Sequence, residues 1–99
     1  MDYKYRIIWS EEAVINLENV LDYLNRRWTE REVNNFKVKL SRLLDIISQN
    51  PRLFPISEFQ PRLRKAVLSR QTTVFYEFND RTVFLVYIFN TAQNPSKIK

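Results

Sequence analysis

The residues of this sequence that could do chemistry are mostly basic, and they gather in its second half. Four of them form a basic cluster within nine residues, namely Arg62, Arg64, Lys65 and Arg70. Cations grouped in this way can contact phosphates, or stabilise the charge that develops when a phosphodiester bond is cleaved. They can equally be the solvated charges of an edge strand that block aggregation. The pattern alone leaves both interpretations open.

Aromatic residues follow the basic cluster along the chain: Phe75, Tyr76, Phe84, Tyr87 and Phe89. Aromatic rings beside cations can stack on nucleic-acid bases, although such residues are more often the core of a sheet. A tyrosine acts as a general base only when its pKa is strongly lowered. We take Tyr87, together with Arg64, Lys65 and Arg70, as the candidate catalytic residues.

The composition excludes several kinds of catalytic and metal site. The 99 residues contain no glycine, no histidine and no cysteine. Without glycine there is no glycine-rich phosphate loop, and without histidine and cysteine there is no zinc finger, thiol nucleophile or Ser-His-Asp triad. Most neighbouring pairs of acidic residues are explained by helix capping. Few carboxylates remain that could hold two metal ions, which argues against a two-metal nuclease. We therefore expect neither a metal nor a cofactor.

The positive charge is distributed unevenly along the chain. The formal net charge is +5, and residues 51–99 carry all of the excess, with eight basic against three acidic side chains. This asymmetry predicts an anionic partner, either nucleic acid or an acidic protein segment. The candidate residues for target binding are Arg62, Arg64, Lys65, Arg70, Arg81 and Lys97.

Two helices are predicted in the first half of the chain. Ser10 is a good N-cap for a helix over residues 11–27, and Thr29 with Glu32 forms a capping box for a second helix. Asn50-Pro51 should end this second helix, because the residue before proline is disfavoured in helical geometry. The short connection between the helices predicts an antiparallel hairpin.

Strands are predicted over residues 3–9, 63–68, 72–78 and 82–89. Asn79-Asp80 should form a two-residue hairpin turn with positive φ. The loop over residues 50–62 is apolar enough that we expect it to pack on the core. The order β-α-α-β-β-β predicts an α+β fold, with the antiparallel helical hairpin on one face of a twisted, mainly antiparallel four-stranded sheet.

Residues 1–99 are expected to form a single domain, in which residues 90–99 are a polar, basic tail. The sequence shows neither a signal-peptide pattern nor an apolar run of membrane-spanning length. Because the chain also lacks cysteine, we expect a cytoplasmic protein that does not associate with membranes.

In the order and spacing of its segments, the chain resembles the RelE/ParE superfamily, the toxins of type II toxin–antitoxin systems. The segments that carry the resemblance are IIWSEEA, LENVLDYL, NPRLFP, RLRKAVL, TTVFYEF and FNTAQNP. The resemblance implies a basic cytoplasmic toxin that inhibits growth, is used in plasmid stabilization, and is neutralised by a cognate antitoxin.

The resemblance also implies site residues, with one departure. Arg64 occupies the basic position of the second strand and Tyr76 the tyrosine of the hairpin, but Ala92 stands where relatives commonly have an arginine. An alanine cannot stabilise a pentacovalent phosphate. The hypothesis is therefore a ParE-like toxin that binds a target such as DNA gyrase. The alternatives are a RelE-like, metal-independent endoribonuclease that cuts mRNA on the ribosome, weakened by Ala92, and a non-toxic protein that only binds antitoxin.

Overall fold

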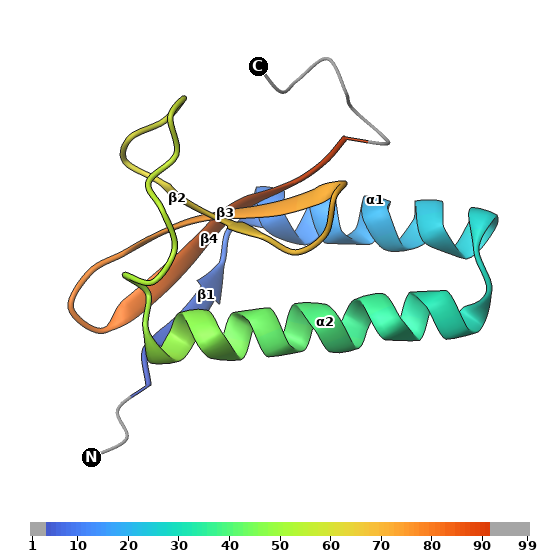
Figure 1. Ribbon diagram of the computed structural model, residues 1–99, viewed down its shortest axis with the longest axis horizontal. Helices are drawn as coiled ribbons and strands as arrows, with labels where there is room; N and C mark the ends of the chain where they lie inside the picture. The colour runs from blue at the N-terminus through green and yellow to red at the C-terminus, as the bar shows by residue number, and fades with distance from the viewer. Residues whose placement is uncertain (1–3, 92–99) are drawn as a thin grey trace.

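Two long helices and a four-stranded sheet make up the computed structural model, which describes residues 4–91 (Figure 1). The elements in chain order are β1 (Arg6–Trp9), α1 (Glu11–Arg27), α2 (Glu30–Gln49), β2 (Arg64–Val67), β3 (Thr72–Phe78) and β4 (Thr82–Asn90). The strand order in the sheet is β1-β4-β3-β2, in which β1 pairs with β4 in parallel and the other pairs are antiparallel. The predicted α+β fold is confirmed.

Both helices begin at the residues that the sequence predicts. The side chain of Ser10 accepts a hydrogen bond from the Ala13 N–H at 2.9 Å, and that of Thr29 accepts one from the Glu32 N–H at 3.3 Å. These bonds satisfy N–H groups that have no partner within the helix. The single residue between Arg27 and the Thr29 cap forces the chain back on itself, so the helices form the predicted hairpin.

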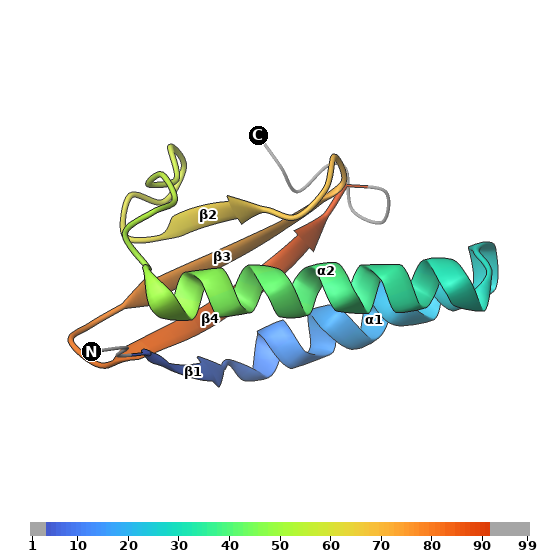
Figure 2. The ribbon, with the colours of Figure 1, turned by 60° about the horizontal axis from the view of Figure 1, so that its bottom comes forward.

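The helical hairpin covers one face of the sheet, as Figure 2 shows. Helix residues such as Ala13, Leu40 and Ile47 pack there against Val74 and Leu85 of the central strands, and all of these side chains are buried. A second, smaller cluster lies on the other face, made by Leu63, Phe75 and Phe89 with the half-buried Val86 and Tyr87. Burial of alternate residues of β3 on both faces explains why this strand is apolar along most of its length.

A bulge in β4 marks the point where α1 replaces β1 at the edge of that strand. Phe75 pairs with Tyr87 whereas Tyr76 pairs with Leu85, so Val86 is an extra residue. Its carbonyl accepts a hydrogen bond from the Ser10 hydroxyl at 2.6 Å. Further along, the Ile88 N–H donates to Asn16 Oδ1 at 2.9 Å. Side chains at the start of α1 therefore satisfy the polar backbone of β4 where β1 has ended.

Two predicted details of the strands are wrong. The first strand begins only at Arg6, because the Tyr5 N–H donates to the Ser48 carbonyl of α2 at 2.8 Å instead of to the sheet; part of the predicted range lies outside the described residues. The turn between β3 and β4 spans residues 79–81, three residues instead of two, and needs no positive φ; no residue in 4–91 has one. Instead, Asn79 Oδ1 accepts hydrogen bonds from the N–H groups of Arg81 and Thr82 at 3.1 and 3.0 Å, which closes the turn.

Within residues 4–91, neither helix has the length and apolar character that crossing a membrane requires.

Candidate functional site

The basic cluster does not form one site, because its members lie on different faces and ends of the sheet. Arg64 pairs with Tyr76 and is on the helix-covered face of β2, whereas Lys65 pairs with Phe75 and is on the opposite face. Arg70 lies between β2 and β3, and Arg81, a further candidate for target binding, lies between β3 and β4. Strand β3 has 7 residues. At about 3.3 Å per residue it separates Arg70 from Arg81 by about 20 Å.

Arg64 is engaged by the loop between α2 and β2. Its Nη1 donates hydrogen bonds to the carbonyls of Phe54 at 2.8 Å and Arg52 at 3.2 Å. Its guanidinium also lies 5.5 Å from the centre of the Phe78 ring, a cation–π contact. The side chain therefore joins the loop to the end of β3.

Tyr76 holds the same loop from inside the core. It is fully buried, and its hydroxyl donates a hydrogen bond to the Pro51 carbonyl at 2.7 Å. Burial raises the pKa of Tyr76 to about 12, and the positive charge of Arg64 opposes this rise only in part. Because a general base needs a lowered pKa, this phenol is not suited to take up a proton at neutral pH.

Tyr87, the predicted catalytic tyrosine, lies on the face of the sheet away from the helices. Its ring stacks on that of Phe75, with the centroids 4.6 Å apart and the planes 20° from parallel. Burial raises the pKa of Tyr87, and the negative charge of Glu12 raises it further. This is the opposite of the shift that a general base requires. Its part in catalysis stays a prediction, as do those of Arg64, Lys65 and Arg70.

The loop over residues 50–62 is held by hydrogen bonds, but its apolar side chains are packed on the core only in part. The Ser57 N–H donates to the Leu63 carbonyl at 2.8 Å, and Pro51 and Ser57 are buried. Phe54 packs against the core, as expected. The expectation is wrong for three residues whose side chains the loop directs to solvent: Leu53, Ile56 and Phe59, with 57%, 52% and 60% of their surface exposed.

A small hollow of about 190 Å³ lies where this loop meets the end of β3. Its lining includes Ile56, Pro61, Arg62 and Glu77. The Arg62 Nε and Glu77 Oε1 atoms are 4.0 Å apart, and both side chains are partly exposed. An exposed ion pair at this distance contributes little to stability, so a carboxylate of a partner can compete for Arg62. We call the loop and this hollow together the loop end.

A larger cleft of about 840 Å³ lies at the other end of β3. It is lined by Trp28, Lys39, Ser69, Arg70, Gln71 and Thr91. Trp28 is 53% exposed, and none of these lining residues is acidic. Among the described residues, neither Lys39 nor Arg70 has an ion-pair partner. Two cations beside an exposed indole can hold an anionic ligand that also carries an aromatic ring. We call this the cleft end.

Of the residues at the cleft end, Arg70 was predicted from the sequence, whereas Trp28 and Lys39 were not. The exposure of Trp28 could have been predicted from the sequence. A large side chain in a very short connection between two helices has few neighbours that could bury it. Lys39 has no such sequence signal, since one lysine on a polar helix face is indistinguishable from its neighbours.

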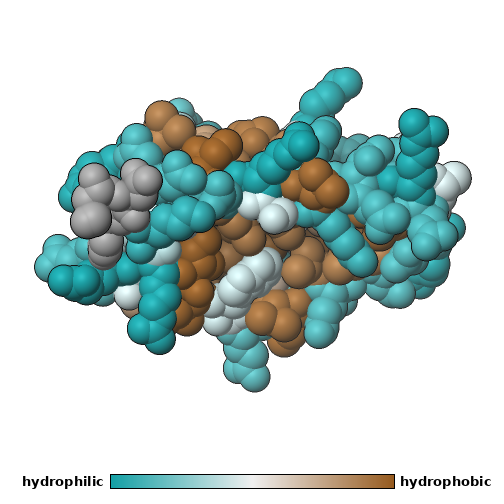
Figure 3. Space-filling view, turned by 90° about the horizontal axis from the view of Figure 1, so that it is seen from below, coloured by the Kyte–Doolittle hydropathy of each residue, from teal (hydrophilic) through white to brown (hydrophobic). Residues whose placement is uncertain are grey.

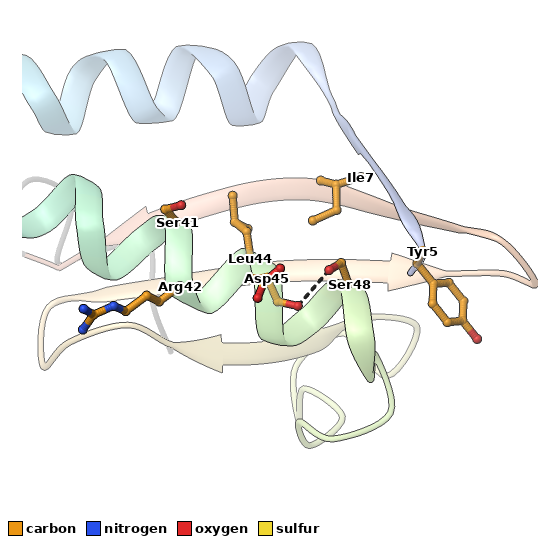
Figure 4. Close-up of a pocket in the computed structure, with 7 residues that line it drawn as sticks. All are labelled: Tyr5, Ile7, Ser41, Arg42, Leu44, Asp45 and Ser48. Carbon is orange, nitrogen blue, oxygen red and sulfur yellow. Dashed lines mark hydrogen bonds between the residues drawn. The ribbon is translucent and has the colours of Figure 1, made fainter. Parts of the chain in front are cut away.

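A third hollow separates β1 from α2 and continues between the helices. Its first part, about 470 Å³, includes Ile7, Leu44 and Asp45 in its lining (Figure 4). The Ser48 hydroxyl donates to the Asp45 carbonyl there at 2.7 Å. The second part, about 290 Å³, shares Leu44 with the first and is lined mainly by leucines: Leu17, Leu21, Leu40 and Leu44. Figure 3 shows apolar side chains along the middle of this face, with polar ones on either side. We call the two parts of this hollow together the helix groove.

Ala92 and Lys97 lie outside the described residues, as does most of the predicted tail. The prediction of a tail from residue 90 is wrong at its start, because Asn90 belongs to β4 and its Nδ2 donates to Thr72 Oγ1 at 2.9 Å. No group of acidic residues within 4–91 is suited to hold a metal ion.

Comparison with known proteins gives matches among solved structures alone. No protein-family model and no curated protein matches the sequence. The chromosomal ParDE TA system from P. aeruginosa matches with a TM-score of 0.74 and 14% identity, over 88% of this chain and 96% of that one.

Two further structures match across nearly their whole length. The E. coli DinJ-YafQ toxin–antitoxin complex has a TM-score of 0.63 and 13% identity, covering 92% of this chain and 97% of that one. The protein HP0894 from Helicobacter pylori has a TM-score of 0.58 and 9% identity, covering 89% and 96%. At these identities the likeness confirms the fold that the resemblance to RelE/ParE toxins implied.

Proposed function

We propose that this chain is the cytoplasmic toxin of a type II toxin–antitoxin module, and that it arrests growth by binding a protein target such as DNA gyrase. The shared fold supports the first part. One observation supports the second: Arg64 and Tyr76, which stand at functional positions of the resemblance, are both bonded to the backbone of the loop between α2 and β2.

Metal-independent cleavage of RNA needs cations and proton-transfer groups that converge on one phosphate. Here Lys65 and Tyr87 lie on the face of the sheet away from the helices, Arg64 lies on the other face, and Arg70 lies at the cleft end. The tyrosine pKa values also shift upward rather than downward. This arrangement favours a binding protein over a nuclease.

The helix groove supports a partnership with an antitoxin. Its leucines would accept the apolar stripe of an amphipathic segment, and Lys37 and Arg42 at its margins would attract acidic residues of that segment. Two of the similar structures are described as a TA system and as a toxin–antitoxin complex. A module of this kind would stabilise a plasmid that carried it.

The alternative is a RelE-like endoribonuclease that acts on ribosome-bound mRNA. The cleft end favours it, because Trp28, Lys39 and Arg70 are suited to a nucleotide. Catalysis there would be weak without an arginine at position 92.

Controlled expression in a bacterial host separates the two functions. We expect growth arrest, rescue by the product of the neighbouring short gene, inhibition of purified DNA gyrase in a supercoiling assay, and ribosome-bound messages with intact 5′ ends. Codon-dependent cuts that disappear in Arg70→Ala and increase in Ala92→Arg would establish the nuclease instead. Unimpaired growth at high protein levels would indicate a protein that only binds antitoxin.

A further inference from the structure

We propose that the loop end is the surface with which the toxin contacts its protein target, an inference that rests on the proposed function. The partner that fits this surface has an apolar contact site bordered by carboxylates. The proposal starts from three large apolar side chains that are exposed on one loop, Leu53, Ile56 and Phe59. Apolar side chains that gather on one exposed segment are typical of a protein-binding site.

The loop exposes these side chains although its backbone is firmly held. The Lys65 N–H donates to the Pro55 carbonyl at 2.9 Å, and Ile56 forms a β-bridge with Arg64. Ser57 Oγ accepts hydrogen bonds from the N–H groups of Phe59 and Gln60, both at 3.3 Å. The turn that carries Phe59 is thus closed by its own hydrogen bonds.

Arg64 and Tyr76 extend this support into the core. Their hydrogen bonds reach the carbonyls of Pro51, Arg52 and Phe54, which lie at the start of the loop. A surface that is ordered before it binds loses less conformational entropy on association. Exposed apolar side chains on a rigid support are therefore suited to act as anchors of an interface.

The charges at the loop end indicate an acidic partner. Arg52, Arg62 and Arg64 lie in or beside the loop, against two acidic residues, Glu58 and Glu77. Arg52 rests over the Phe78 ring at 5.1 Å, so its charge stays near the surface of the loop end. The hollow beside Ile56 and Arg62 can accept one side chain of the partner.

The same residues favour a protein over a nucleic acid. Leu53 and Ile56 have no aromatic face on which a base could stack, and Phe59 is the one exposed ring among the loop's apolar residues. The cleft end has the opposite composition, with an indole, two cations and no exposed aliphatic residue in its lining. A nucleic acid would therefore be expected at the cleft end.

The test uses the growth arrest caused by the full chain. We compare Ile56→Ala/Phe59→Ala with the matched control Ile15→Ala/Val38→Ala, whose parent side chains are 50% and 48% exposed on the helices. Protein levels are equalised by immunoblot, and folding is checked by thermal unfolding of the purified variants. The loop variant should need at least tenfold more protein to arrest growth, whereas the control should act like the unsubstituted chain. Arg62→Glu should weaken arrest more than Arg62→Gln.

The possible outcomes can be told apart. A folded loop variant that arrests growth at the unsubstituted level overturns the proposal. So does loss of arrest in Lys39→Gln/Arg70→Gln together with full arrest in the loop variant, which would place the target at the cleft end. If the unsubstituted chain fails to arrest growth, the proposed function itself is refuted.

Discussion

The loop end and the cleft end of the molecule both have basic and aromatic residues in or beside them, but these residues are engaged differently. At the loop end, the guanidinium of Arg64 is bonded to two carbonyls and the phenol of Tyr76 to a third. At the cleft end, Lys39 and Arg70 have no ion-pair partner among the described residues, and Trp28 is exposed. The role of a basic or aromatic residue therefore depends on whether backbone carbonyls near it need a hydrogen-bond donor, and not on its residue type alone.

Removing the buried ring of Tyr76, which bonds to the loop from the core, should have the largest effect on stability. We expect Tyr76→Ala to lower the free energy of unfolding by about 3–5 kcal/mol, because a fully buried aromatic leaves a cavity and the Pro51 carbonyl loses its donor. Urea denaturation followed by circular dichroism measures this loss. Tyr87→Ala is the control, since its ring is half-buried and should cost clearly less. Similar losses for the two variants would show that the buried Tyr76 ring contributes no more to stability than the half-buried Tyr87 ring.

Arg64→Gln should have the next largest effect. The shorter side chain cannot reach the carbonyls of Arg52 and Phe54, and the loss of charge-assisted hydrogen bonds should lower the free energy of unfolding by about 2 kcal/mol. Arg70→Gln, the same change at the cleft end, should be nearly neutral. The comparison of the two ends would be wrong if the two substitutions had equal effects in urea denaturation.

Alkaline pH should weaken the loop end through Tyr76. The pKa of a phenol in the unfolded chain is near 10, and burial raises the pKa of Tyr76 to about 12 in the folded chain. Its contribution to stability is therefore complete below pH 10 and is lost as the pH rises towards 12, because the unfolded chain releases this proton first. By pH 11 the loss should be about 1.4 kcal/mol. Urea denaturation at pH 9 and 11 should show a smaller decrease for Tyr76→Phe, and an equal decrease would assign the effect to other groups.

Local features of the fold follow from the sequence, whereas features that depend on distant segments do not. Ser10 and Thr29 cap helices through bonds to residues three positions away, so a short sequence window contains both partners. The bulge at Val86 depends on where α1 packs against β4. The residues of α1 and its cap lie far from Val86 in the sequence, so a short segment around Val86 does not include them.

The candidate site shows the same limit. The basic and aromatic residues could be found by type, but Arg64 and Tyr76 acquire their roles from carbonyls 10 to 25 positions away in the chain. Lys39 and Arg70 line the same cleft, although the rest of α2, a loop and a strand separate them in the sequence. The exposure of Leu53, Ile56 and Phe59 contradicts their hydrophobicity, since the backbone bonds of the loop fix which way its residues face.

The smallest effect on stability should come from the cleft end. Lys39→Gln/Arg70→Gln should change the free energy of unfolding by less than about 0.5 kcal/mol, because neither charge is paired within the described residues. The same variant should bind a single-stranded RNA oligonucleotide more weakly, and the slope of log K against log salt should fall by about 1.4, or 0.7 for each phosphate that the variant no longer neutralises. Fluorescence anisotropy at several salt concentrations measures both quantities.

Arg52→Gln/Arg62→Gln is the matched control at the loop end, and we expect it to leave the slope nearly unchanged. If this control changed the slope as much as the cleft variant, both ends would contribute to nucleic-acid affinity. The assignment of protein contacts to the loop end and nucleic-acid contacts to the cleft end would then be wrong.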